Sequence, residues 1–125
     1  AASYRAMVRR VVADFLDLAF VGTTLREVRS ATRNSWTAIL YDRASDAFYA
    51  GPEFAGMEVE DRVGGGDGFA SGFIYGYLTG ATPQEAVTLG TAHGALLQTT
   101  RGDTSQVTLA ELRAVAAGAG ARIVR

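Results

Sequence analysis

The spacing of apolar and polar residues predicts one amphipathic helix followed by a group of strands. Residues 4–19 place six apolar side chains on one helical stripe, and the charged residues fall mostly on the other faces. This pattern is typical of a helix at the surface of a core. Residues 18–25 form a short apolar run rich in strand-forming side chains. The polar residues 26–34 that follow are expected to be irregular.

Two further segments have the character of strands on either side of a short turn. Residues 35–42 and 46–51 flank the sequence Arg-Ala-Ser, so we expect a β-hairpin. Gly51 and Pro52 interrupt this pattern, because proline cannot donate a hydrogen bond to a sheet. Residues 54–61 are long enough for another short strand.

Helical spacing returns after three consecutive glycines at positions 64–66. Aromatic side chains recur every four residues, at Phe69, Phe73 and Tyr77. A row of glycines has the same spacing: Gly68, Gly72 and Gly76. Glycine inside a helix costs about 1 kcal/mol relative to alanine, so three glycines in register predict that this helix lies close against another element.

Capping signals predict two more helices toward the carboxyl end. Thr82 followed by Pro83 suits the residue before a helix and its first residue, and an apolar pattern of helical length follows. Thr108 and Glu111 have the spacing of a capping box, which predicts the start of a last helix. The order of helix, strands and three helices indicates one α/β domain over residues 1–125.

The basic residues exclude several kinds of chemistry. Lys and Arg together number 12, and all of them are arginines. A chain without lysine has neither the lysine of a Walker-type phosphate loop nor a Schiff-base amine. The single histidine, His93, excludes a histidine metal cluster, and we predict no metal ligands. Carboxylates, arginines, hydroxyls and backbone amides remain for catalysis.

Charge and cysteine content narrow the partners and the compartment. A net charge of -1 gives no indication of nucleic acid or an anionic membrane as a partner, and the apolar runs are far shorter than the roughly 20 residues that span a bilayer. The sequence lacks cysteine and an apolar signal core, which favours a reducing cytoplasm. The first residue is alanine, which suggests a processed or truncated chain. Homo-oligomer formation is left open.

The stretch Gly64-Gly65-Gly66-Asp67 has two interpretations at this point. Glycine is common in turns and aspartate is a favoured N-cap, so the stretch would serve only to begin a helix. Alternatively, successive glycines direct several N–H groups into one concavity, the helix adds its positive end, and Asp67 accepts a proton from a hydroxyl. A dinucleotide-binding loop fits less well, because Phe69 occupies the position of its third glycine or alanine.

Residues 61–72, Asp-Arg-Val-Gly-Gly-Gly-Asp-Gly-Phe-Ala-Ser-Gly, resemble the carboxyl-terminal signature of the ribokinase (pfkB) family of carbohydrate kinases. That signature runs roughly D-x-x-G-A-G-D-x-F-x-x-G, and Gly65 replaces its alanine. Residues 23–42 and 99–115 are similar to the corresponding segments of 2-keto-3-deoxygluconate kinases, as are the closing residues 121–125. The resemblance implies the carboxyl-terminal portion of a ribokinase-like, three-layer α/β fold.

The resemblance also implies a role for each matched position. Asp67 would be the general base that takes a proton from a sugar-acid hydroxyl as the hydroxyl attacks the γ-phosphate of ATP, which carries Mg²⁺. Gly64, Gly65 and Gly66 would form the anion hole for the transferred group. Asp103 matches an aspartate that family members bring to the substrate. Four positions match nucleotide-binding segments approximately: Thr24, Arg26, Ala92 and His93.

The sequence leaves open how much of the kinase function this chain has, and it leaves open the roles of His93 and Arg26. Family members are more than twice as long, so the resemblance implies that the amino-terminal half with its sugar-binding lid is absent. The chain would then be an ATP-dependent sugar kinase in part, or a non-catalytic α/β fragment or nucleotide-binding module without activity by itself. His93 either packs within its helix or lies near the adenine, and Arg26 faces either solvent or phosphate.

Overall fold

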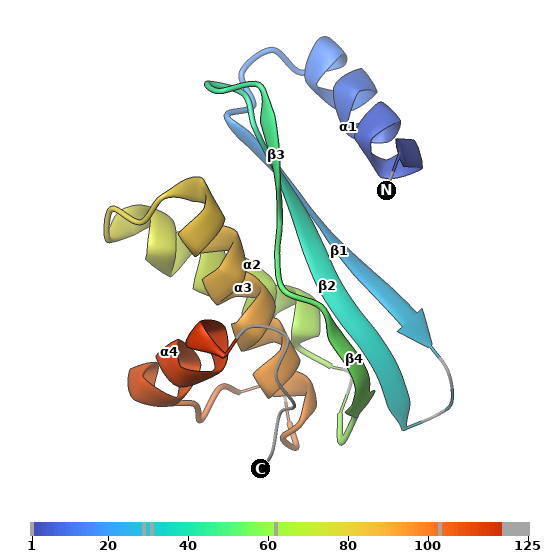
Figure 1. Ribbon diagram of the computed structural model, residues 1–125, viewed down its shortest axis with the longest axis vertical. Coiled ribbons are helices and arrows are strands. Elements are labelled where there is room, and N and C mark those ends of the chain that lie inside the picture. The colour runs from blue at the N-terminus through green and yellow to red at the C-terminus, as the bar shows by residue number, and fades with distance from the viewer. Residues whose placement is uncertain (1, 29, 31, 62, 103, 119–125) are drawn as a thin grey trace.

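The computed structural model describes residues 2–28, 30, 32–61, 63–102 and 104–118. A helix precedes a four-stranded antiparallel sheet, and three helices follow the sheet (Figure 1). The helices are α1 (Ala2–Asp14), α2 (Gly65–Leu78), α3 (Pro83–Gln98) and α4 (Leu109–Ala117). The strands are β1 (Phe20–Val28), β2 (Arg33–Asp42), β3 (Ala47–Ala50) and β4 (Phe54–Glu58). This arrangement confirms the predicted α/β class.

The strand β1 extends further than the sequence pattern predicts. The polar residues 26–34 predict an irregular segment, but β1 continues to Val28 and β2 begins at Arg33. All nine residues of β1 pair with β2, so the ladder satisfies the backbone N–H and C=O groups that face β2, whatever the side chains are. The prediction of an irregular segment is therefore wrong for most of its length, because pairing between the two neighbouring strands overrides local composition.

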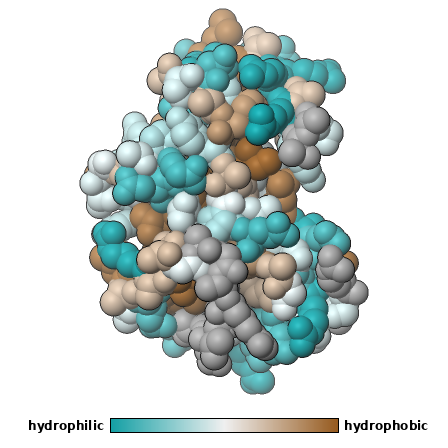
Figure 2. All heavy atoms as spheres, in the orientation of Figure 1, coloured by the Kyte–Doolittle hydropathy of each residue, from teal (hydrophilic) through white to brown (hydrophobic). Residues whose placement is uncertain are grey.

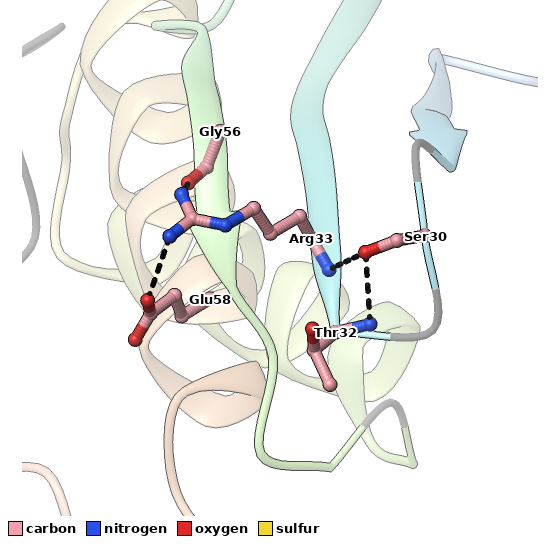
Figure 3. Close-up of polar contacts among 5 residues, drawn as sticks. All are labelled: Ser30, Thr32, Arg33, Gly56 and Glu58. Carbon is pink, nitrogen blue, oxygen red and sulfur yellow. Dashed lines mark hydrogen bonds and ion pairs between the residues drawn. The ribbon is translucent and has the colours of Figure 1, made fainter.

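Side-chain hydrogen bonds close the turn between β1 and β2 and attach β2 to β4 (Figure 3). The hydroxyl of Ser30 accepts hydrogen bonds from the backbone N–H groups of Thr32 and Arg33, at 3.3 and 3.1 Å. The guanidinium of Arg33 donates to the Glu58 carboxylate at 2.9 Å and to the Gly56 carbonyl at 3.5 Å. Arg33 thus links two strands of the sheet.

The sheet has β2 at its centre, and its two faces carry different helices. The predicted hairpin is confirmed, because β3 pairs antiparallel with β2, and β4 also pairs with β2. Alternate β2 residues Trp36, Ala38 and Leu40 are buried in one core with residues of α2, α3 and α4. Tyr41 lies on the opposite face and forms a second cluster with Val8 and Val12 of α1. The sheet therefore separates two helical layers, as Figure 1 shows.

Arg43 explains why α1 is shorter than predicted. The apolar stripe predicts a helix through residue 19, but α1 ends at Asp14. The guanidinium of Arg43 donates hydrogen bonds to the carbonyls of Val12 and Phe15, both at 2.8 Å, and to that of Leu18. A cation that pairs with carbonyls at a helix end satisfies acceptors that otherwise have no partner.

The contact between α2 and α3 is made by glycines on both helices, as the glycine row predicts. A Cβ added to Gly72 would lie 2.8 Å from the carbonyl oxygen of Leu89 and 2.9 Å from the Cα of Gly90. A Cβ added to Gly90 would in turn lie 2.7 Å from the carbonyl oxygen of Phe69. Side chains of any size would therefore push the two backbones apart.

Capping boxes begin both later helices. The predicted box of Thr108 and Glu111 is confirmed at the start of α4. Thr82 precedes Pro83 at the start of α3, as predicted, and Glu85 completes a second box there. The backbone N–H of Thr82 donates to the Glu85 carboxylate, and the Thr82 hydroxyl oxygen accepts from the backbone N–H of Glu85. The hydrogen bond from the Thr82 backbone holds the pKa of Glu85 below its ordinary value.

Several large apolar side chains stay exposed. Figure 2 shows apolar residues at the surface over the strands, between the α1 end and the α2–α3 end of the molecule. The most exposed include Phe15, Leu16, Val28, Tyr77 and Leu78. None of the helices in the described part of the chain combines the length and apolar character that a bilayer span requires.

Replacing Gly72 by alanine should destabilise the fold. The methyl group gains about 1 kcal/mol of helix propensity, but overpacking against Leu89 and Gly90 costs about 1–3 kcal/mol. We expect a net loss of about 1 kcal/mol in the free energy of unfolding, measured by urea titration. Gly66→Ala is the matched control, because a Cβ at Gly66 meets nothing within 4 Å. Equal effects of the two substitutions would contradict the packing argument.

A second prediction concerns Asp46, whose carboxylate accepts hydrogen bonds from the Tyr41 hydroxyl at 2.7 Å and the Arg9 guanidinium at 3.3 Å. These contacts lower the pKa of Asp46 from 3.8, chiefly through Tyr41. The ionised carboxylate therefore stabilises the fold above that pKa, and the contribution is lost as the pH falls through the lowered value. Asn tolerates the φ of 50° at this position, so Asp46→Asn removes the charge alone.

Wild-type protein should consequently lose more stability than Asp46→Asn between about pH 5 and about pH 2. Urea midpoints measured across this range would show the difference, and hydrogen exchange in α1 would locate it. Parallel losses in both proteins would mean that Asp46 has the same pKa in the folded and unfolded chains.

Candidate functional site

The glycine stretch forms the turn that begins α2. Gly64 occupies the N-cap position with φ 93° and ψ -6°, a left-handed conformation that favours glycine. The first hydrogen bond of the helix runs from the N–H of Gly68 to the carbonyl of Gly64, at 2.7 Å. Asp67 is therefore the third residue of the helix, and its interpretation as an N-cap is wrong, because Gly64 holds that position.

Backbone donors and a carboxylate share the first turn of α2. The N–H groups of Gly65, Gly66 and Asp67 precede the first helical hydrogen bond and bond to no other described residue. The backbone at Gly66 borders open space, since an added Cβ would meet nothing within 4 Å. The carboxylate of Asp67 is exposed and has no hydrogen bond or ion pair with the described residues. Free amides and the positive end of a helix favour an anion here.

Asp61 connects this turn to the loop after α3. Its carboxylate accepts hydrogen bonds from the N–H of Val63 at 3.0 Å and from the N–H of Gly102 at 3.1 Å. Asp103, the residue after Gly102, lies outside the described residues, so its predicted role stays a prediction. The sequence motif contains Asp61 at its first position, which is the signal that could have pointed to this function.

Arg26 and Thr24 lie on the face of β1 that the helices α2 and α3 cover. They pair with Trp36 and Ala38 of β2, and the guanidinium of Arg26 lies 5.7 Å from the centre of the Trp36 ring. The same ring contacts α3, because a Cβ added to Gly94 would lie 2.7 Å from it. Arg26 and Thr24 both remain exposed, so each has surface available for a ligand.

Gly94 in turn contacts the glycine stretch. Its added Cβ would lie 2.9 Å from the carbonyl oxygen of Gly65. The ring of Trp36 thus separates Arg26 from the helix–helix contact on which the first turn of α2 rests. Arg26 is therefore linked to the glycine stretch only indirectly, through Trp36 and Gly94.

His93 joins α3 to the first turn of α2 and to the loop before α4. Its Nδ1 lies 2.9 Å from the carbonyl oxygen of Gly68 and 3.1 Å from the hydroxyl of Ser71, and its Nε2 lies 2.8 Å from the hydroxyl of Ser105. A carbonyl only accepts, so a hydrogen on Nδ1 fits this geometry and leaves Nε2 of the neutral ring to accept from Ser105. Ala92 has 0% exposure and belongs to the core, with no surface for a ligand.

A cavity of about 290 Å³ opens beside His93. It lies between α2, α3 and α4, and its walls combine apolar side chains with hydroxyls and one imidazole. The lining residues are Ser71, Gly72, Tyr75, His93, Ser105, Val107, Thr108, Leu109 and Leu112. Sequence reasoning missed most of this set, because the residues come from three helices and a loop and share no motif.

Among the described residues, no three His, Asp or Glu side chains gather as a group that could hold a metal ion. The donors at the start of α2 are N–H groups, which bind anions rather than cations.

Comparisons with known proteins agree with this geometry. The model of the pfkB family carbohydrate kinases matches residues 22–109. The chain is similar to a 2-dehydro-3-deoxygluconokinase from Thermotoga maritima, with 30% identity and a TM-score of 0.87 over 94% of this chain and 35% of that one. Comparison with curated proteins gave no significant match.

Two other solved structures share the fold. A putative 2-keto-3-deoxygluconate kinase from Enterococcus faecalis is 25% identical, with a TM-score of 0.75 over 94% of this chain and 33% of that one. A PfkB family carbohydrate kinase from Listeria grayi is 24% identical, with a TM-score of 0.82 over 88% of this chain and 34% of that one. The chain thus spans about a third of each structure and has part of a ribokinase-like fold. Because the family model matches most of its length, the chain belongs to the pfkB family of carbohydrate kinases.

Proposed function

We propose that this chain forms the nucleotide-binding and base-bearing part of an ATP-dependent sugar kinase. The observation that carries the proposal is the first turn of α2, where the exposed carboxylate of Asp67 lies with three N–H groups that have no partner among the described residues. Phosphoryl transfer needs mainly positioning and stabilisation of charge from a protein. The first turn of α2 has groups for both tasks.

In this proposal Asp67 is the general base. It accepts the proton of a sugar hydroxyl while the hydroxyl oxygen attacks the γ-phosphorus of ATP. A bond forms between that oxygen and phosphorus, the bond from phosphorus to the β–γ bridging oxygen breaks, and ADP leaves. The N–H groups of Gly65 and Gly66, at the turn that Gly64 makes, stabilise the negative charge on the transferred group.

The cavity beside His93 is our candidate for the nucleoside end of ATP. Its apolar walls suit a flat base, and the hydroxyl oxygens of Ser71 and Ser105 can accept hydrogen bonds at one edge. His93 also contacts the carbonyl of Gly68, one residue beyond Asp67. The base and the phosphates would therefore bind at opposite sides of the same helical turn, with Thr24 and Arg26 approaching from β1.

Mg²⁺ fits this site as an ion bound to the nucleotide. The start of α2 presents N–H donors, and the described residues contain no acidic cluster that would hold the ion alone. A magnesium ion on the phosphates would neutralise charge during transfer. The protein's own residues would then orient the phosphates and hold the acceptor hydroxyl near Asp67.

We further propose 2-keto-3-deoxygluconate as the sugar acid. The similar proteins from Thermotoga maritima and Enterococcus faecalis are described as kinases of this sugar acid, which is the support for the choice. Asp103 is the proposed substrate-binding residue, and it follows in sequence Gly102, whose N–H donates to the Asp61 carboxylate. A nucleotide-binding module without activity by itself is the second candidate, because the chain spans about a third of these kinases.

Nucleotide binding by the 125-residue chain tests the first step. Titration with Mg-ATP, followed by calorimetry, should show binding that Arg26→Ala weakens about tenfold to a hundredfold, the loss for a charge-assisted hydrogen bond. Arg33→Ala is the matched control, because Arg33 pairs with Glu58 at 2.9 Å and should not affect affinity. Absence of binding to the wild-type chain would overturn the nucleotide assignment.

The role of Asp67 is tested by Asp67→Asn in a protein that joins this chain to the other two thirds of a ribokinase-like fold. Asparagine keeps the size of the side chain but cannot accept the proton, so turnover should fall by about 10² to 10⁴. The affinity for ATP should stay nearly the same. Turnover within a few fold of wild type would remove the assignment of Asp67 as the base.

A further inference from the structure

We propose that Gln98, the last residue of α3, is a positioning residue that sets how the glycine turn of α2 rests on α3. The inference builds on the proposed function, because the turn is the proposed phosphate site. Gln98 has 0% exposure, which is unusual for a glutamine. It has no surface from which to contact a ligand, so it would act through the residues it touches.

The side chain of Gln98 lies directly against the first residue of α2. A Cβ added to Gly65 would lie 3.0 Å from its Nε2, 3.1 Å from its Cδ and 3.2 Å from its Cγ. Only glycine leaves room for this contact without a shift. The complementarity accounts for glycine at the position where the pfkB signature has alanine.

The backbone of the same residue holds the segment that enters the turn. The carbonyl of Gln98 accepts hydrogen bonds from the N–H of Glu60 at 2.9 Å and from the N–H of Asp61 at 3.2 Å. Gln98 therefore contacts the chain on both sides of Gly64, through its carbonyl before the turn and its side chain after it. A turn held at both ends by one residue has little freedom to change its distance from α3.

Hydrogen bonding fixes the amide of Gln98 only in part. Its Nε2 donates to the carbonyl of Gly94 at 3.0 Å, whereas its buried Oε1 has no partner among the described residues. Burial of a polar atom without a partner costs free energy. An apolar side chain of similar size would avoid this cost, which favours a role in positioning over one in stability alone.

The position of the turn matters for the proposed reaction. Donors stabilise a developing negative charge when they lie about 2.7–3.1 Å from the oxygen that carries it. A displacement of a few tenths of an ångström at Gly65 would move the N–H groups of Gly65, Gly66 and Asp67 together. The contact between Gln98 and Gly65 therefore controls the geometry of the whole anion site.

A double-mutant cycle tests the proposal in the 125-residue chain. Gly65→Ala places a methyl group against Gln98 and should shift the backbone amide resonances of residues 64–67 and weaken Mg-ATP binding about tenfold. Adding Gln98→Ala makes room for that methyl group, so the double variant should regain most of the wild-type shifts and affinity. Additive losses in the double variant would overturn the proposal.

Two further variants separate position from stability. Gln98→Met keeps the volume and loses the hydrogen bond, so the amide shifts of the turn should stay near wild type, whereas Gln98→Ala alone should change them. Thr88→Ala, also on α3, is the control and should leave the shifts unchanged. Melting temperatures are measured for every variant, and a cycle in which amide shifts only follow stability would count against Gln98.

The amide shifts are measured with and without Mg-ATP. Rescue of the shifts without any nucleotide binding to wild type would support the role of Gln98 and reject the nucleotide assignment. Nucleotide binding to wild type without rescue of the shifts would support the nucleotide assignment and reject the role of Gln98.

Discussion

The close contact between α2 and α3 is the constraint on which the rest of the structure depends. Glycines on both helices let the two backbones touch, and the Trp36 ring, whose Nε1 donates to the Thr91 carbonyl at 3.0 Å, fixes α3 on the sheet. At this separation the imidazole of His93 reaches the Gly68 carbonyl. The first turn of α2 is consequently positioned by packing beneath it, while Gly66 borders open space and the first three N–H groups have no partner among the described residues.

Much of the fold could be predicted from the sequence because its strongest signals are local. The capping pairs located the starts of α3 and α4, and the glycine row predicted the helix contact. The extents of β1 and α1 could not be predicted in the same way. β1 is lengthened by its pairing with β2, and α1 ends where Arg43, from a distant turn, takes its last carbonyls. Neither partner belongs to the element whose length it changes, so the periodicity of that element alone does not show it.

The candidate site was likewise predictable where a local motif marks it, and not where distant residues meet. The motif located Gly64 to Asp67, but the left-handed conformation of Gly64 decides which of them is the N-cap. Asp61 and Gly102 are 41 positions apart, and His93 and Ser105 are 12 apart, so neither contact follows from spacing. The contact of Gln98 with Gly65 could not be predicted either, because in the sequence a buried glutamine at a helix end looks the same as an ordinary polar residue that ends a helix.

The strand β1 lies at one end of the strand order, where its only partner in the described part of the chain is β2. On its other edge β1 has no paired strand among the described residues. A strand added at that edge would be held by peptide groups, whose geometry does not depend on the identity of the side chains. This edge is therefore where the sheet can be extended, by evolution or by protein engineering, with the least demand on the sequence that joins it.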